Sequence, residues 1–221
     1  MPDASRVHGR TFLRQHRLAP LRRLRENGRT AVAWRQFSVD TTGNPDFAAV
    51  SAVCALLSSL TVPYWFIGGW AIDLAAGRMT RDHADVDVMM LERDKHALWS
   101  DLTAVDVEPA GALGPGRLVL HSDKLLLPAE VFLSRADGMS LVYRRGGFSV
   151  TRALADVTRY RDGIPYLSPE VVLLFKARSK AARDQHDVET ALPLLDAGQR
   201  SWLHDTLRLL PQGKPPSVPP E

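Results

Sequence analysis

The sequence predicts an α+β fold, α/β-like in its first half, in which a mixed sheet flanked by helices precedes a helical region. Between Asn44 and about Val150, spacings typical of helices alternate with short apolar runs typical of strands. From Ser168 onward only helical patterns remain. With 221 residues, 45% of them hydrophobic and 24% charged, the chain has an ordinary globular composition and room for one good core or two small ones.

The elements of the first half follow from the apolar pattern. The first helix is predicted by apolar residues at helical spacing, namely Phe47, Val50, Val53, Leu57 and Leu60. The run "YWFI" predicts a short buried strand, "WAIDLAAG" a brief helix that ends at Gly77, and "DVDVMML" an alternating strand. Leu98 and Leu102 mark a further helix, and "RLVLH", "AEVFLS" and "SLVYRR" predict three more strands.

The second half is expected to be helical over residues 151–210. The segment "SPEVVLLFKARSK" begins with Ser168, which suits the N-cap, and Pro169, which suits the first turn. A second helix is predicted to open at Asp184 with "DQHDVETALPLL", and "RSWLHDTLRLL" predicts a third after Gly198. The α+β region that these helices follow spans 44–150.

The two ends of the chain differ in composition from these regions. The extension over 1–43 is basic, since residues 1–36 carry nine arginines and two acids, a net charge of +7 that leaves −4 of the total +3 for the rest. A basic arm could bind nucleic acid or an anionic surface, but this one has no aromatic interleaving, which favours a frayed or dispensable extension. The tail over 211–221 is too rich in proline to form a packed element.

Composition also bounds the cellular setting. The longest apolar stretches are shorter than the roughly 20 residues that a membrane-spanning helix needs, and the N-terminus shows no apolar signal segment. We therefore expect a cytoplasmic protein with no membrane partner. Cys54 is the single cysteine, so no internal disulfide can form, and its apolar neighbours predict a packed thiol.

The segment "FIGGWAIDLAAGRMTRDHADVDVMM" carries two features that suit phosphate chemistry. Alternation in the second strand places Asp85 and Asp87 on one face, about 7 Å apart, where they repel each other unless a cation lies between them. Mg²⁺ prefers such oxygen ligands and shares them with substrate phosphates. Gly68 and Gly69 join a strand to a helix, so their backbone N–H groups could face an anion. The alternatives are solvated acids at a strand edge and an ordinary glycine turn.

Taken together, these features resemble the nucleotidyltransferase superfamily of the polymerase β type. The segment "GGWAIDLAAGRMTRDHADVDV" is similar to the branch of aminoglycoside and lincosamide nucleotidyltransferases, in which a Gly-Gly-Trp-Ala opening, a Gly-Arg-x-Thr-Arg-x-His turn and an Asp-x-Asp recur at this spacing. In this sequence the matching residues are Gly68, Gly69, Trp70, Ala71, Gly77, Arg78, Thr80, Arg81, His83, Asp85 and Asp87.

The resemblance implies a third carboxylate on a neighbouring strand. Glu130 in "LPAEVFLS" is the candidate, although many relatives have Asp there. Together with Asp85 and Asp87 it would form the catalytic and metal-binding set, and it would accept the proton of the acceptor hydroxyl, a role for which Asp87 is the alternative. The other interpretation of Glu130 is an acid on an exposed strand face. His83 is expected to order the turn rather than to bind metal.

The second half also resembles this branch. There, Lys176 stands where a lysine faces the nucleotide phosphates, and Arg81 and Arg145 are further candidates for nucleotide binding. Arg145 and its neighbour in "YRRGG" could equally be solvated charges at a strand end. For Asp184 and Asp187 we favour helix capping and helix-dipole charge over a catalytic role.

The resemblance implies a Mg²⁺-dependent enzyme that transfers a nucleoside monophosphate, expected to be AMP from ATP, to a hydroxyl group. The leading acceptor is a small molecule such as an aminoglycoside or lincosamide antibiotic, and the acidic body would suit a cationic sugar. A protein or tRNA acceptor, as in toxin–antitoxin pairs, is the disfavoured alternative. A nucleotide-binding module without turnover is a third possibility, which the three acids argue against.

Overall fold

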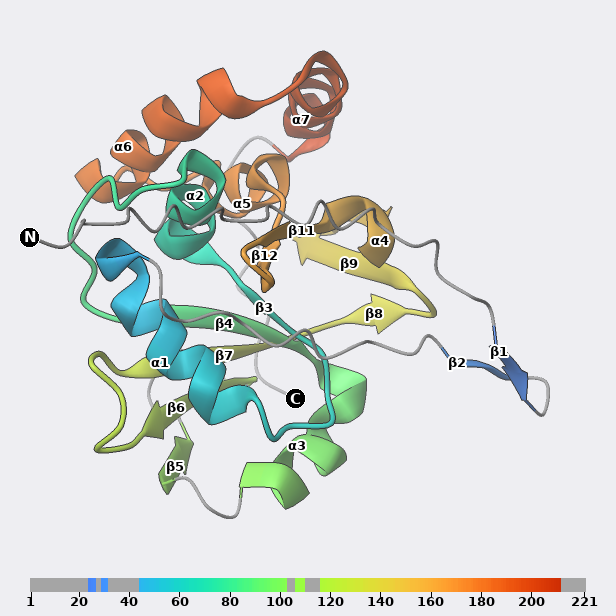
Figure 1. Cartoon of the computed structure of the whole chain (residues 1–221). Coiled ribbons are helices and arrows are strands. Elements are labelled where there is room, and N and C mark those ends of the chain that lie inside the picture. Colours follow the sequence, from blue (N-terminus) through green and yellow to red (C-terminus); the bar gives the residue numbers. More distant parts are fainter. Residues whose placement is uncertain (1–23, 27–28, 32–43, 103–105, 110–115, 212–221) are drawn as a thin grey trace, which may run out of the picture. The chain divides into compact units, whose positions relative to one another are not determined.

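The computed structural model describes residues 24–26, 29–31, 44–102, 106–109 and 116–211 (Figure 1). Residues Met1–Arg35 and Gln36–Glu221 form two separate units. In the first unit, strands Leu24–Glu26 (β1) and Arg29–Ala31 (β2) pair antiparallel. Apart from this hairpin and Pro211, the predicted basic extension and proline-rich tail lie outside the described residues.

The second unit is built on a mixed sheet, as predicted. Seven strands are seen within the described ranges, in the order β11-β12-β3-β4-β7-β6-β5. Their bounds are Thr158–Arg161 (β11), Ile164–Leu167 (β12), Tyr64–Phe66 (β3), Val86–Leu91 (β4), Ala129–Ser134 (β7), Arg117–His121 (β6) and Asp106–Pro109 (β5). The pairs β12/β3 and β4/β7 are parallel, and the others are antiparallel.

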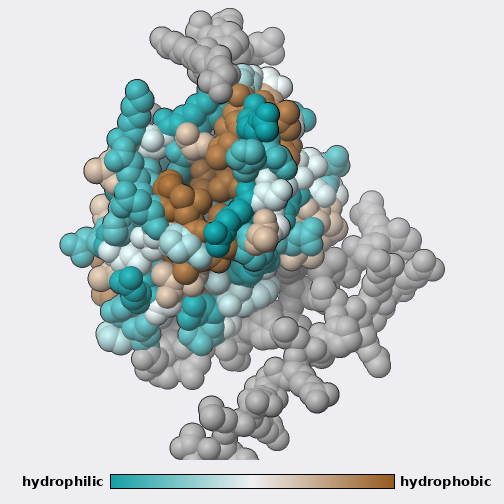
Figure 2. Space-filling model, turned by 90° about the horizontal axis from the view of Figure 1, so that it is seen from above, coloured by the Kyte–Doolittle hydropathy of each residue, from teal (hydrophilic) through white to brown (hydrophobic). Residues whose placement is uncertain are grey.

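Helices accompany this sheet, and Figure 1 shows α1 crossing in front of it while α2, α5, α6 and α7 gather on its upper side. Their bounds are Ala48–Leu57 (α1), Gly68–Ala76 (α2), Lys95–Asp101 (α3), Leu154–Val157 (α4), Pro169–Lys176 (α5), Ala182–Ala191 (α6) and Ala197–Leu209 (α7). Short 3₁₀ turns cover Pro45–Phe47 (η1), Glu92–Asp94 (η2) and Leu192–Leu194 (η5). Helix α6 packs against both α2 and α5. Seen from above, apolar side chains gather at the middle of this upper face and hydrophilic ones surround them (Figure 2).

The segment from Ala136 to Leu167, which includes the boundary between the predicted α+β and helical regions, holds more strands than the sequence suggested. Strands Ala136–Asp137 (β8), Ser140–Arg145 (β9) and Phe148–Ala153 (β10) form a separate antiparallel sheet. The hairpin β11–β12 turns at Asp162 and Gly163, both with positive φ, and β12 then joins the central sheet beside β3. Part of the 151–210 region predicted as helical is therefore strand, because the Asp-Gly turn in "YRDGIPY" makes a hairpin.

From Pro169 onward the described chain is helical, as predicted. Ser168 is the N-cap residue of α5 and Pro169 is its first residue, but the Ser168 hydroxyl donates to the Glu170 carboxylate instead of capping the backbone. The next helix begins with Ala182, two residues before the predicted start at Asp184.

The central strand β4 lies in the middle of the hydrophobic core. Met89 and Met90 are both fully buried although they point to opposite faces, so both sides of the strand are covered. Cys54 is also buried, as predicted, and this burial raises the pKa of its thiol to about 12, which leaves it unreactive. None of the helices in the described stretches is long and apolar enough to span a membrane. Within β4, Asp87 is the polar exception.

Candidate active site

The junction between β3 and α2 is shaped by Gly68. This residue has φ +63°, a left-handed conformation that favours glycine, and a Cβ atom here would overlap the Oδ2 atom of Asp87. The backbone N–H of Ile67 donates to the carbonyl of Asp87 at 3.0 Å, which fixes the two strands side by side. The Asp87 carboxylate is therefore held against the first turn of α2, where backbone N–H groups carry partial positive charge.

Gly69 makes room for other side chains. A Cβ atom at this position would overlap the Arg81 guanidinium and the His83 ring. Both residues come from the loop that leads from α2 to β4, so this loop lies directly over the first turn of α2. The second glycine thus has a packing role in addition to the phosphate contact that the sequence suggested for it.

The predicted carboxylates meet at one end of β4 and β7. Asp87 and Glu130 are directly opposite in the parallel register of these strands, so their side chains leave the sheet on the same face. Asp85 lies one residue before β4, and its carbonyl accepts a 2.9 Å hydrogen bond from the Trp70 indole. Burial raises the pKa of Asp87 to about 7, and the neighbouring charges of Asp85 and Glu130 add to the effect.

Cations moderate this repulsion. Lys176 and Arg117 both lower the pKa of Asp87, although less than the carboxylates and burial raise it. In the stretches that the structure describes, no three His, Cys, Asp or Glu side chains already form a metal-binding geometry. The three acids therefore lie within electrostatic reach of one another without being arranged as a ready-made metal cage.

Glu130 has a partner that the sequence analysis missed. Arg117 at the start of β6 forms an ion pair with Glu130, and its guanidinium lies 4.6 Å from the centroid of the Phe132 ring. The Glu130 side chain is 19% exposed, so it is not an acid on an open strand face. The pairing is diagonal between antiparallel strands, since Val119 is directly opposite Glu130, and only the register of β6 on β7 reveals it.

Lys176 and Arg81 are joined by a single buried acid. Asp187 in α6 is fully buried, and it receives Arg81 Nε at 2.8 Å, Arg81 Nη2 at 3.1 Å and Lys176 Nζ at 2.9 Å. Lys176 also donates to Asp184, which accepts the Ser179 hydroxyl as well. Burial opposes ionisation of Asp187, but the hydrogen bonds from Arg81 and Lys176 hold its pKa below the usual range.

The capping part of the interpretation of these two acids is wrong, whereas Asp184 does lie in the first turn of α6, where negative charge suits the helix dipole. The N-cap of α6 is Ala181, and no side chain caps it. The carboxylates of Asp184 and Asp187 instead bind cations from α5 and from the loop after α2. An acid near a helix start looks the same in sequence whether it caps its own helix or reaches another element, so the local pattern could not separate the two.

A second buried acid, Asp73, orders the loop before β4. His83 Nε2 lies 2.6 Å from Asp73, and the Thr80 hydroxyl donates to the same carboxylate at 2.5 Å. The His83 ring also stacks on Trp70 at 4.1 Å between centroids. His83 therefore orders this turn, as predicted. Asp73 was not singled out in the sequence, because "WAIDLAAG" marks it only as one polar residue in a helix.

Arg145 is not brought into this group. It lies at the exposed end of β9, in the separate three-stranded sheet, and none of the described acids of the site forms an ion pair with it. Its proposed nucleotide contact remains a prediction with no geometric support.

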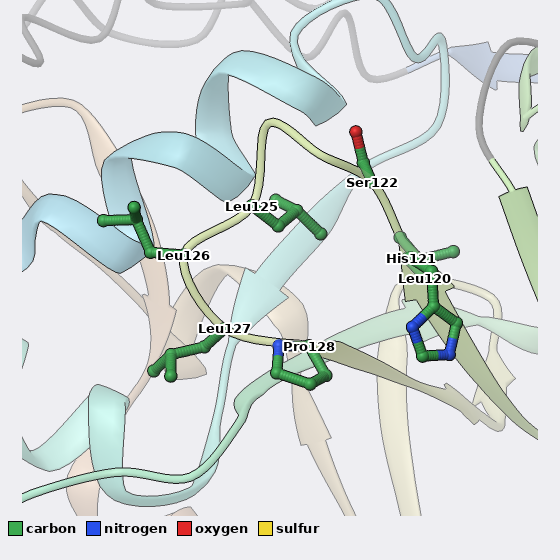
Figure 3. A pocket seen from close by; sticks show the side chains of 7 residues that line it. All are labelled: Leu120, His121, Ser122, Leu125, Leu126, Leu127 and Pro128. Atoms are coloured by element: carbon green, nitrogen blue, oxygen red, sulfur yellow. The ribbon is translucent and has the colours of Figure 1, made fainter.

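A small cavity of about 180 Å³ lies in the loop between β6 and β7, close in sequence to Glu130. In Figure 3, Leu125 points into this loop whereas Leu126 points away from it. The lining residues are Leu120, His121, Ser122, Leu125, Leu126, Leu127 and Pro128. The volume is below the roughly 300 Å³ of typical ligand sites, so we assign no ligand to this cavity.

These features fit the nucleotidyltransferase class that the sequence suggested. They are a mixed sheet with a Gly-Gly corner, acids on two neighbouring strands, and cations near the same helix terminus. The chain belongs to the aminoglycoside-2''-adenylyltransferase family, whose sequence profile matches residues 49–189. It is 24% identical over 142 residues to a lincosamide resistance protein of Staphylococcus haemolyticus, a match that covers 59% of this chain and 84% of that protein.

Solved structures support the same fold. The lincosamide antibiotic adenylyltransferase LnuA with lincomycin bound matches with a TM-score of 0.52 and 21% identity, over 67% of this chain and 97% of that one. ANT(2'')-Ia in complex with adenylyl-2''-tobramycin matches with a TM-score of 0.51 and 14% identity, over 75% and 98%. The predicted fold and family are thereby confirmed, whereas the roles of individual site residues remain predictions.

Proposed function

We propose that this enzyme is a Mg²⁺-dependent adenylyltransferase that moves AMP from ATP to a hydroxyl group of a small antibiotic-like molecule. The observation that carries the proposal is the placement of Asp87. It lies beside Glu130, against the first turn of α2 and within electrostatic reach of Lys176. Acids, a helix terminus and a cation thus lie near one another, an arrangement that would suit a metal-bound triphosphate.

The acids of the site suit a divalent cation. Asp87 is partly buried close to Asp85 and Glu130, and burial together with these two negative charges raises its pKa. Oxygen donors of this kind are the ligands that Mg²⁺ prefers, and Asp85, Asp87 and Glu130 would hold it. When bound, Mg²⁺ would neutralise charge on the phosphates and help to orient the acceptor hydroxyl.

The chain's own groups would carry the remaining steps. Backbone N–H groups at Gly68 and Gly69 would donate hydrogen bonds to phosphate oxygens at the positive end of α2. Lys176 and Arg81 would neutralise the triphosphate. Glu130, held by Arg117, would accept the proton of the attacking hydroxyl, with Asp87 as the alternative base, and pyrophosphate would leave in line with the attack.

The acceptor is proposed from the relatives. One solved neighbour binds lincomycin and another an adenylylated tobramycin, so a lincosamide or an aminoglycoside is the first expectation. The acidic charge of the chain outside its N-terminal segment would suit such amine-bearing molecules. A cytoplasmic setting with access to ATP fits this reaction. A protein or tRNA acceptor is the alternative, and the basic N-terminal segment is the feature that would favour it.

Transfer assays with α-labelled nucleotide would test the proposal. The purified protein is incubated with Mg²⁺, each of the four labelled nucleoside triphosphates in turn, and a panel of lincosamides and aminoglycosides. Label on a small molecule is expected with ATP, and its absence from every panel member and macromolecule would refute the function. Deletion of residues 1–36 should leave antibiotic modification intact if the acceptor is a small molecule, and should impair acceptor binding if the acceptor is a protein or tRNA.

A further inference from the structure

One side chain outside the proposed acid site links three segments that are distant in sequence. Asp187 from α6 binds Arg81 from the loop after α2 and Lys176 from the end of α5. In α6 it is one of two buried residues, the other being Ala191. The attachment of this helix therefore depends on a buried ion-pair network as well as on apolar packing, and burial of a charged group is tolerated only with such partners.

One cation held by Asp187 lies at the start of α2, and the other lies near the acid that faces this start. The Arg81 guanidinium lies over Gly69, so close that a methyl group there would overlap it. Lys176 is near enough to Asp87 to stabilise its ionised form. Since Asp87 itself lies against Gly68, the arginine and the lysine both lie near the place where the triphosphate of the proposed reaction would bind.

Each cation keeps donors for an anion after its bond to Asp187. Arg81 has five N–H groups, of which three serve Asp187 and the carbonyl of Asp82. Lys176 has three, of which the described contacts account for two, one to Asp187 and one to Asp184. The Asp187 carboxylate thus fixes the orientation of both groups while leaving N–H groups for phosphate oxygens.

We propose that Asp187 is a positioning residue that holds Arg81 and Lys176 as a two-pronged clamp for the triphosphate. The inference rests on the proposed function only for the identity of the anion. Asp184 differs from Asp187, because it contacts Lys176 but not Arg81 and its side chain is 14% exposed, whereas that of Asp187 is fully buried. Two fixed prongs bind a flexible polyphosphate better than mobile side chains would, since less conformational freedom is lost on binding.

Binding of Mg·ATP and of inorganic tripolyphosphate to the full-length protein tests this inference by calorimetry. Asp187→Asn should weaken both by about 10- to 100-fold, the loss typical of misaligned hydrogen bonds to charged groups. The two losses should be equal, because the clamp contacts phosphates and not the base. In transfer assays the same variant should raise KM for ATP and leave KM for the acceptor unchanged, with kcat at saturating ATP within about threefold.

Two further variants serve as the control and as the substitute for Asp187→Asn. Glu170→Gln is the matched control, because Glu170 is an equally buried acid paired with Arg152 outside this cluster, and its loss should lower the melting temperature without changing affinity for either probe. Arg81→Lys keeps the charge but cannot bind Asp187 in the two-nitrogen mode, so it should also weaken both probes even if Asp187→Asn does not fold.

A double-mutant cycle separates positioning from general damage. If Asp187 acts through the cations, Asp187→Asn should cost little further affinity in an Arg81→Gln, Lys176→Gln background, whereas independent effects would add. Additive losses, or wild-type affinity for both probes in Asp187→Asn and Arg81→Lys, would overturn the inference, as would a wild-type protein that binds neither probe. A wild-type protein that binds Mg·ATP but transfers no AMP would refute the proposed function instead, and the binding data would still decide the role of Asp187.

Discussion

Two groups of carboxylates lie beside the same helix terminus and differ in how they are neutralised. In the acid centre, formed by Asp85, Asp87 and Glu130, one arginine pairs with Glu130, and the pKa of Asp87 is raised to about 7. In the clamp cluster, Asp184 and Asp187 share Lys176 and Arg81, and the pKa of each acid is lowered. Burial disfavours the charged form in both places, so the difference comes from the partners.

This contrast distinguishes a group of acids that could bind a further cation from a group whose charges are already balanced by arginine and lysine. The acid centre holds negative charge at a cost, which a divalent cation would relieve. In the clamp cluster two carboxylates are balanced by two cations, so a metal ion would add no further neutralisation. Paired acids alone therefore do not identify a metal site, and the state of their neutralisation is the more informative observation.

The largest expected effect is the loss of transfer when the acid centre is changed. Asp87→Asn removes a negative charge that the proposed Mg²⁺ requires. Because such a metal contributes several kcal/mol to stabilisation of the transition state, we expect kcat/KM to fall about 1000-fold or more. Labelled-AMP transfer measures the loss, and circular dichroism checks the fold. Turnover close to wild type in both Asp85→Asn and Asp87→Asn would contradict the site assignment.

Stability should respond in opposite directions in the two clusters. Between about pH 4 and pH 7 the native protein binds a proton at Asp87 that the unfolded chain has released, since the pKa is about 7 in the fold and 3.8 ordinarily, so stability falls as pH rises. A neutral Asn side chain at this position avoids this loss of stability. In metal-free buffer at pH 8, Asp87→Asn should be more stable than wild type by up to about 4 kcal/mol, and the gain should vanish below about pH 4.

Asp187→Asn should behave in the reverse way. It leaves Arg81 and Lys176 without their buried partner, a change that costs about 3–5 kcal/mol. Because the pKa of Asp187 is lowered in the fold, its contribution is present above the ordinary carboxyl pKa and is lost as pH falls. Thermal or urea unfolding at pH 8 and pH 4 measures both variants, and shifts of the same sign at pH 8 would remove the proposed distinction.

Sequence reasoning succeeded where the signal was local. The α+β order, the glycine corner at Gly68 and the turn ordered by His83 all follow from short patterns whose residues meet within one strand–helix–strand unit. Glu130 is predictable as well, because a lone charge inside the apolar run of a neighbouring strand needs a cation or a ligand beside it. The sequence therefore predicts the fold and a position for Glu130 on a strand near Asp87, which the parallel register of β4 and β7 confirms, whereas the function of the acid centre stays a prediction.

The features that sequence reasoning missed depend on long-range pairing. Arg117 meets Glu130 only through the register of β6 on β7, and Asp187 meets Arg81 across 106 positions. The strands β11 and β12 fall in the 151–210 region predicted as helical, and their short runs become recognisable as strands only when the Asp-Gly hairpin pairs them. Local patterns assign each residue to a face or an element, but they do not say which distant element that face will meet.

The smallest effect expected concerns Arg117, the cation that pairs with Glu130 in the acid centre. This arginine positions Glu130 and lowers the pKa of Asp87, so its removal should leave Glu130 less well oriented and Asp87 less ionised at neutral pH. We expect Arg117→Ala to lower kcat/KM about tenfold at pH 7, the scale of one charge-assisted hydrogen bond. The deficit should shrink at pH 8.5, where Asp87 ionises without help.

The control for this prediction is Arg117→Lys, which keeps the charge and should retain most of the activity. A pH profile of kcat/KM in all three proteins makes the measurement, because a merely structural role would give a deficit that does not change with pH. The opposite result has a clear meaning. If Arg117→Ala were faster than wild type or needed less Mg²⁺, the arginine would be a competitor of the metal for Glu130, and the acid centre would resemble the clamp cluster in being neutralised at rest.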